Sequence, residues 1–68
     1  MTVELNGRAV SLPADATVAA AVAALDAGEA RRGIAVAVDG TVVPRSEWDA
    51  TELEDGQKVE VVGAIQGG

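Results

Sequence analysis

The side chains that usually carry out chemistry in enzymes are scarce in this chain. Histidine and cysteine are both absent from its 68 residues, which removes the usual general base near neutral pH and the usual strong nucleophile. A serine nucleophile needs an adjacent general base, and the sequence offers no plausible one for Ser11 or Ser46. The lack of cysteine also excludes disulfides and thiolate metal sites. We therefore do not expect catalysis by nucleophilic attack of a side chain.

Three other patterns could suggest ligand binding, but each has a plainer interpretation. The isolated glycines form neither a GxGxxG nor a GxxxxGK loop, so nucleotide binding lacks support. Arg31-Arg32 is a two-residue basic spot that we interpret as a solvated pair and not as an anion site. An acidic run lacks the spacing of a calcium loop and is interpreted as a solvated loop face; its members are Glu47, Asp49, Glu52, Glu54 and Asp55.

The C-terminal end presents a reactive group that needs no side chain. Gly67-Gly68 carries the α-carboxylate on the slimmest backbone available, and two terminal glycines occur by chance in only about 0.5% of chains. The alternative is an arbitrary frayed end. The last six residues can extend about 20 Å, at roughly 3.3–3.6 Å per residue, which is far enough to thread a narrow active site of a partner.

A free carboxylate needs activation before it can react as an acyl donor. With an α-carboxyl pKa near 3.5 it is anionic at neutral pH and offers no good leaving group. Transfer of AMP from ATP would create a mixed anhydride, and a sulfur nucleophile could then displace AMP to leave a thiocarboxylate. The end of the chain is therefore a candidate substrate for other enzymes.

The composition indicates one small domain with an aliphatic core. Hydrophobic residues make up 49% of the chain, and Trp48 is the only aromatic residue. The net charge of −6 would repel a phosphate backbone and disfavours nucleic-acid binding. It favours a basic surface on a protein partner, or simply serves solubility. No apolar segment approaches the length of a membrane span or resembles a signal peptide, so we expect a cytoplasmic protein.

The first half of the sequence predicts a β-hairpin followed by a helix. Alternating apolar residues over Thr2 to Asn6 and over Arg8 to Leu12 are typical of half-buried strands, and Asn6-Gly7 suits a type I′ turn between them. Pro13 closes the second strand. We expect Thr17 to cap a helix that ends near Gly28. One apolar stripe marks the buried face of this helix: Val18, Ala21, Val22 and Leu25.

The second half predicts three further strands. Ile34 to Val38 is apolar on both faces, as expected of an interior strand, and a short strand over Thr41 to Val43 is cut off by Pro44. The polar stretch from Arg45 to Asp55 is expected to be irregular, with Trp48 and Leu53 anchored in the core. After the Asp55-Gly56 turn comes a last strand over residues 57–62, in which Val59 and Val61 share a face.

This order of elements predicts an α+β fold of the β-grasp type, with one main helix on one face of a mixed sheet of four or five strands. A right-handed crossover after the hairpin would place the last strand in the middle of the sheet, beside the first strand. We expect a folded domain over residues 1–62 and a flexible tail over residues 63–68, because nothing in the tail sequence would hold it down.

The chain resembles the ThiS family, the ubiquitin-like sulfur carriers of thiamine biosynthesis, over nearly its whole length. The most specific features are Val43-Pro44-Arg45-Ser46-Glu47-Trp48 and the ending Ala64-Ile65-Gln66-Gly67-Gly68, supported by the Asn6-Gly7 hairpin, Thr17-Val18, and Asp55-Gly56 before Val59-Glu60-Val61-Val62. Ile65 stands where the family has valine, which could alter the fit to a partner but not the chemistry.

The resemblance implies that this chain is a co-substrate and not an enzyme. An E1-like adenylyltransferase would use ATP-Mg to adenylate Gly68, a sulfur donor such as a cysteine desulfurase system would convert it to a thiocarboxylate, and thiazole synthase would consume that sulfur. The partners would recognise the tail residues Gly67, Gln66, Ile65 and Ala64. No cofactor is expected to bind the chain itself.

Several alternatives share the fold. The small subunit of molybdopterin synthase has the same Gly-Gly end and activation chemistry, but it is usually longer and has proline-rich or aromatic residues before its end. A carrier for cysteine biosynthesis, a ubiquitin-like modifier joined to lysines, and a β-grasp interaction module with an inert end are the others. A separate hypothesis concerns docking: Val62, with Ala64 and Ile65, forms an apolar strip for partners, unless Val62 packs inward at a sheet edge.

Overall fold

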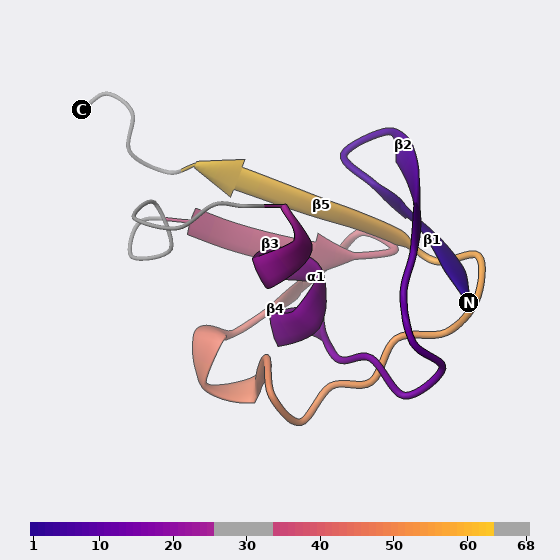
Figure 1. Cartoon of the computed structure of the whole chain (residues 1–68). Helices are drawn as coiled ribbons and strands as arrows, with labels where there is room; N and C mark the ends of the chain where they lie inside the picture. The colour runs from indigo at the N-terminus through magenta and orange to yellow at the C-terminus, as the bar shows by residue number, and fades with distance from the viewer. Residues whose placement is uncertain (26–33, 64–68) are drawn as a thin grey trace.

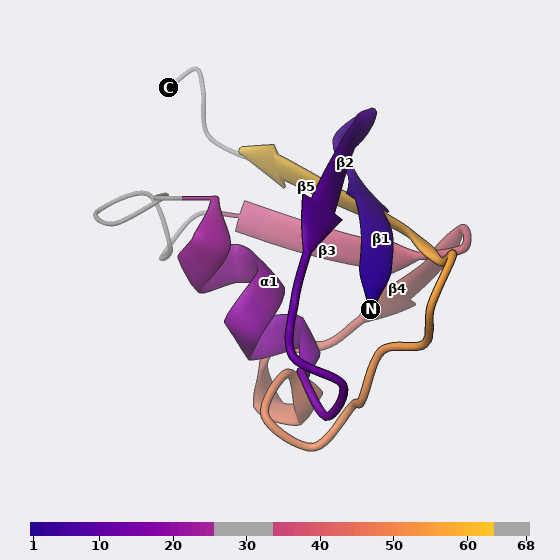
Figure 2. The same cartoon turned by 45° about the vertical axis from the view of Figure 1, so that its right-hand side comes forward.

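The computed structural model describes residues 1–25 and 34–63, and these form a five-stranded sheet with a helix on one side (Figures 1 and 2). The sheet order is β2-β1-β5-β3-β4. The elements along the chain are β1 (Thr2–Leu5), β2 (Arg8–Ser11), α1 (Val18–Ala24), β3 (Ile34–Val38), β4 (Thr41–Val43), the 3-10 helix η2 (Arg45–Glu47) and β5 (Lys58–Gly63). The predicted β-grasp arrangement is confirmed.

The hairpin at the start of the chain forms as expected. Asn6 and Gly7 have φ angles of 51° and 84°, the two positive values that a type I′ turn requires. β1 and β2 pair antiparallel from Thr2↔Ser11 to Leu5↔Arg8. The turn therefore follows directly from the Asn-Gly dipeptide, whose residues tolerate left-handed backbone.

Helix α1 begins where predicted but is shorter than expected. The Thr17 side chain accepts a hydrogen bond from the Ala20 N–H, which makes Thr17 the N-cap. The helix ends at Ala24 with Leu25 as its C-cap, and not near Gly28, which lies outside the described residues. The Leu25 N–H bonds to the Val22 carbonyl, three residues back, and such a tightened last turn is typical of a helix end.

The segment after β4 contributes the largest core side chain. Pro44 ends β4 at the edge of the sheet, as predicted. The stretch expected to be irregular contains the short 3-10 helix η2. Trp48, which follows it, is buried and donates a hydrogen bond from Nε1 to the Val43 carbonyl oxygen at 2.9 Å. Leu53 is also buried. Both residues are thus the core anchors that the sequence predicted.

Strand β5 occupies the centre of the sheet. It pairs parallel with β1, through Glu4↔Lys58 and Leu5↔Val59, and antiparallel with β3. The prediction that the last strand lies beside the first is therefore confirmed. Gly63, which we expected to begin the tail, is the last residue of β5 and lies opposite Ile34.

The core lies between α1 and one face of the sheet. The helix stripe residues Val18, Ala21 and Val22 are fully buried, and Val36 and Val59 meet them from β3 and β5. The opposite face of the sheet is not covered by any described segment, as Figure 2 shows. β3 therefore lies between two other strands, as predicted. One of its two apolar faces packs in the core, and the other lies on the face that no described segment covers.

Candidate functional site at the end of β5

The residues expected to carry sulfur and to be recognised by partners follow directly after the central strand. β5 ends at Gly63. Gly68, expected to carry the reactive carboxylate, lies outside the described residues, together with Gly67, Gln66, Ile65 and Ala64. Within the described residues, the candidate site is therefore the end of β5, which is the yellow strand in Figure 1, with the side chains around it.

The start of β5 is fixed in the fold by side chains as well as by its neighbouring strands. Val59 is 0% exposed. The Asp39 side chain, from the turn between β3 and β4, accepts a hydrogen bond from the Lys58 N–H at 3.0 Å. The Asn6 side chain bonds to Val61 nearer the end of the strand. Strand β5 is therefore held by side-chain hydrogen bonds at Lys58 and at Val61, in addition to its pairing with β1 and β3.

Val62, the predicted docking residue, lies on the open face of the sheet. It is 60% exposed and sits on the central strand opposite Ala35 of β3. The alternative that Val62 packs inward at a sheet edge is wrong on both counts. Side chains alternate along a strand, so the inward position falls to Val61 and the outward positions to Val62 and Glu60.

Val62 belongs to an apolar patch on this open face. We call it the open-face patch; its members are Val62 of β5, Ala35 and Ala37 of β3, and Val42 of β4. Val42 is 67% exposed. Ala37 lies opposite Val42 on one side and opposite Glu60 on the other. An exposed carboxylate therefore borders an otherwise aliphatic surface.

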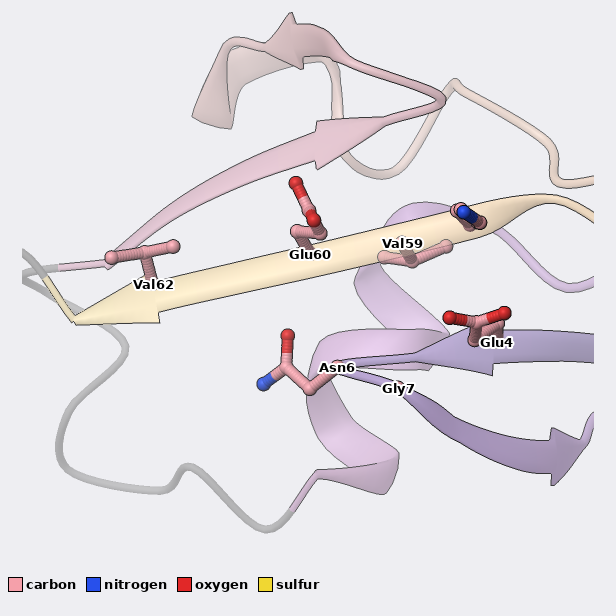
Figure 3. A pocket seen from close by; sticks show the side chains of 7 residues that line it. Glu4, Asn6, Gly7, Val59, Glu60 and Val62 are labelled. Atoms are coloured by element: carbon pink, nitrogen blue, oxygen red, sulfur yellow. The ribbon is translucent and has the colours of Figure 1, made fainter.

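A depression of about 460 Å³ lies beside the patch, between the end of β1 and β5. Figure 3 shows Asn6 and Glu4 on one side of it and Glu60 and Val62 on the other. Its lining is mixed, since Lys58 also contributes. The lining therefore combines two carboxylates, one ammonium group and an amide with the aliphatic side chains of Val59 and Val62.

In the acidic run, the side chain of Asp55 forms a hydrogen bond within the fold. Asp55 accepts a hydrogen bond from the Thr2 N–H at 2.7 Å and so closes the loop before β5 onto β1. In residues 1–25 and 34–63 no group of three or more His, Cys, Asp or Glu side chains is arranged to hold a metal ion. Arg31-Arg32, interpreted as a solvated pair, lies outside the described residues.

Within the part of the chain that the structure describes, no helix is long and apolar enough to cross a membrane. Gly40 and Gly56 have φ angles of 85° and 87° and serve as turn residues, because glycine adopts positive φ without a steric penalty.

Two features of the site were missed from the sequence. The Asn6 side chain reaches residue 61, and the open-face patch joins residues of three strands. The only signal for the patch was alternation within each strand, because the register between strands cannot be read from it. The position of Asn6 in the hairpin turn was enough to explain this residue, so no pattern in the sequence indicated that its side chain also bonds to β5.

The comparisons with known proteins agree with this arrangement. A model of the ThiS family matches residues 2–68. The crystal structure of the thiamine biosynthesis protein (ThiS) from Geobacter metallireducens is similar to this chain with a TM-score of 0.81 and 28% sequence identity, and the alignment covers 100% of both chains. No curated protein sequence matches the chain. The fold and the family model together establish that the chain belongs to the ThiS family of sulfur carriers in thiamine biosynthesis.

Proposed function

We propose that the Gly68 carboxylate is adenylated by an E1-like adenylyltransferase and then converted to a thiocarboxylate, which donates sulfur for the thiazole of thiamine. The observation that carries this proposal is that the family match runs through residue 68 and so includes the Gly67-Gly68 end. The position of β5 supports it, because this strand, with Val59 buried in the core, ends at Gly63, five residues before Gly68.

The proposed chemistry has two group transfers, both performed by other proteins. A Gly68 carboxylate oxygen attacks the α-phosphorus of ATP-Mg, pyrophosphate leaves, and an acyl adenylate forms. A sulfur nucleophile then attacks the carbonyl carbon, and AMP leaves with the original carboxylate oxygen. A hydrosulfide yields the thiocarboxylate directly, whereas a persulfide donor yields an acyl disulfide that a thiol must reduce. The chain binds no cofactor in this scheme.

In this scheme the chain is a protein co-substrate. Its partners are the E1-like adenylyltransferase, thiazole synthase and a sulfur donor such as a cysteine desulfurase system. Membership of the ThiS family favours thiamine over molybdopterin or cysteine biosynthesis as the pathway. The cytoplasmic location stays a prediction, and so does the division into a domain and a tail.

The test is a mass measurement on the intact chain after incubation with ATP-Mg, the E1-like enzyme and a sulfur donor. We expect the mass to rise by the difference between one sulfur and one oxygen atom. A variant with one alanine added after Gly68 is the matched control, because it moves the carboxylate while leaving residues 1–63 unchanged. No mass change in the unmodified chain, with partners that activate another carrier, would reject the proposal and favour the inert module.

We also propose that the open-face patch docks the adenylyltransferase. Val62 and Val42 are the large hydrophobic side chains that are most exposed among the described residues, and both lie on the face that no described segment covers. Burying such aliphatic groups against a partner releases water at roughly 25 cal/mol per Å². Val62 is followed by only one more strand residue, so docking here would hold the start of the tail at the partner's surface.

Val62→Asp tests the docking role. The substitution places a charge in the patch and should weaken binding to the adenylyltransferase about tenfold or more, because a buried unpaired carboxylate is costly. Ser11→Asp is the matched control: it adds the same charge at an exposed position of the outermost strand β2. Equal affinity of the two variants by calorimetry would reject docking through Val62.

A further inference from the structure

The two hairpin turns of this fold share a backbone conformation and a second role. Asn6 and Asp39 have φ angles of 51° and 50°, and each is followed by a glycine with positive φ. Both side chains reach across to the backbone of β5: Asp39 bonds to Lys58 at the start of the strand, and Asn6 bonds to Val61 near its end. The turns thus tie down the central strand at two points.

The Asn6 side chain takes the place of a missing strand residue. β1 pairs with β5 only through Glu4↔Lys58 and Leu5↔Val59, and the Asn6 N–H adds a bond to the Val59 carbonyl. Beyond this point the Asn6 amide continues the ladder: its Oδ1 accepts from the Val61 N–H at 2.8 Å and its Nδ2 donates to the Val61 carbonyl at 3.2 Å. Figure 3 shows Asn6 beside the strand at this place.

This clamp holds the segment of β5 from which the tail departs. In the described part of the chain, the Asn6 side chain is the only group that bonds to β5 beyond Val59 on the side away from β3. The ends of strands open easily when one edge lacks partners. Opening at Val61 would displace Val62 from the open-face patch and move the origin of the tail.

We infer that Asn6 is a positioning residue for the activation of Gly68: its amide keeps the end of β5 closed, so that the docking surface and the tail reach the activating enzyme together. The inference rests on the proposed function. The physical effect is on apparent affinity, because a partner that binds only the closed strand end sees a reduced fraction of competent molecules when the end opens. The chemical step at the carboxylate is unaffected once the complex has formed.

Asn6→Gly is the decisive variant, since glycine keeps the positive φ of the turn and removes the clamp. Asp39→Gly is the matched control: it makes the same kind of change in the other turn and removes two side-chain hydrogen bonds, from Lys58 and Gln57, at the start of β5. Pyrophosphate release by the E1-like enzyme measures activation, and amide hydrogen exchange measured by NMR reports on the Val61 N–H.

For Asn6→Gly we expect KM for the carrier to rise about three- to tenfold and kcat to change by less than about twofold, the size of effect that one or two exposed hydrogen bonds produce. Exchange of the Val61 N–H should accelerate about fivefold or more, whereas Asp39→Gly leaves both readouts near the wild-type values. Asn6→Asp retains the acceptor for the Val61 N–H, so its KM should lie between that of the wild type and that of Asn6→Gly.

The outcomes separate the inference from the proposed function. If the wild-type chain releases no pyrophosphate with a competent enzyme, the proposed function fails, and the positioning role fails with it. If the wild-type chain is activated but Asn6→Gly and Asp39→Gly have the same KM, the proposed function stands and the positioning role of Asn6 is overturned. A fall in kcat with unchanged KM would also overturn it.

Discussion

Two valines of β5 allow the same chemical change to be tested on the two faces of the sheet. Val59 is 0% exposed and Val62 is 60% exposed, although both belong to the central strand. Truncation to alanine removes the same two methyl groups in each case. We predict that Val59→Ala unfolds far more easily than the wild type and that Val62→Ala does not.

The magnitude follows from burial. Removing two buried carbon atoms costs about 1.6 kcal/mol of transfer free energy at roughly 0.8 kcal/mol each. A cavity that the surrounding core closes only in part adds up to about 1 kcal/mol, so Val59→Ala should lower the free energy of unfolding by about 2–3 kcal/mol. At Val62 most of the side chain already meets water, no cavity forms, and the cost should be about 0.5 kcal/mol.

Urea titration followed by tryptophan fluorescence measures the difference, because Trp48 is the only aromatic residue and is buried. A loss of 2–3 kcal/mol from a domain of this size corresponds to a fall in Tm of about 10–20 °C. The dependence of stability on urea concentration should be the same in both variants, which would show that only stability has changed.

Equal costs for the two substitutions would refute the reasoning. A cost above about 1.5 kcal/mol at Val62 would mean that something covers the open face in solution. A dependence of that cost on protein concentration would identify the cover as a second copy of the chain. A cost below about 1 kcal/mol at Val59 would contradict the placement of this side chain in the core.

Three further predictions concern other parts of the molecule. Trp48→Phe should cost about 2 kcal/mol or more by circular dichroism, because the buried Val43 carbonyl loses its donor; no measurable loss would contradict that hydrogen bond. Thr17→Ala should cost only about 0.5–1 kcal/mol, since the capping bond to the Ala20 N–H is long at 3.4 Å, and a cost above about 2 kcal/mol would show a larger role. Association with the activating enzyme should slow as salt rises if the net charge of −6 meets a basic surface, and a rate independent of salt would exclude such steering.

Much of the fold could be predicted from local signals. The Asn6-Gly7 dipeptide has few alternatives to a tight turn because it tolerates positive φ, and Pro44 has no N–H with which to continue a ladder. Thr17 caps α1 because its hydroxyl can satisfy an orphan N–H of the first turn. Each of these outcomes depends on backbone chemistry within a few residues, which the order of amino acids states directly.

Other features required the assembled sheet. The sequence shows that Val61 and Val62 face opposite ways, but the position of α1 decides that Val61 packs against the core and Val62 faces outward. Helix α1 ends at Ala24 with Leu25 as its C-cap, whereas the glycine signal at position 28 lies outside the described residues.

The open-face patch and the Asn6 clamp are the clearest cases of tertiary determination. The clamp joins residues 55 positions apart, and the patch depends on the registers of β3 with both β4 and β5. Period-two alternation specifies a face within one strand but contains no information about the neighbouring strand's register. By itself, the sequence determined the hairpin, the central strand and the Gly67-Gly68 end. Only the tertiary structure decided which surface accompanies that end, because this surface is made by residues that meet across the sheet.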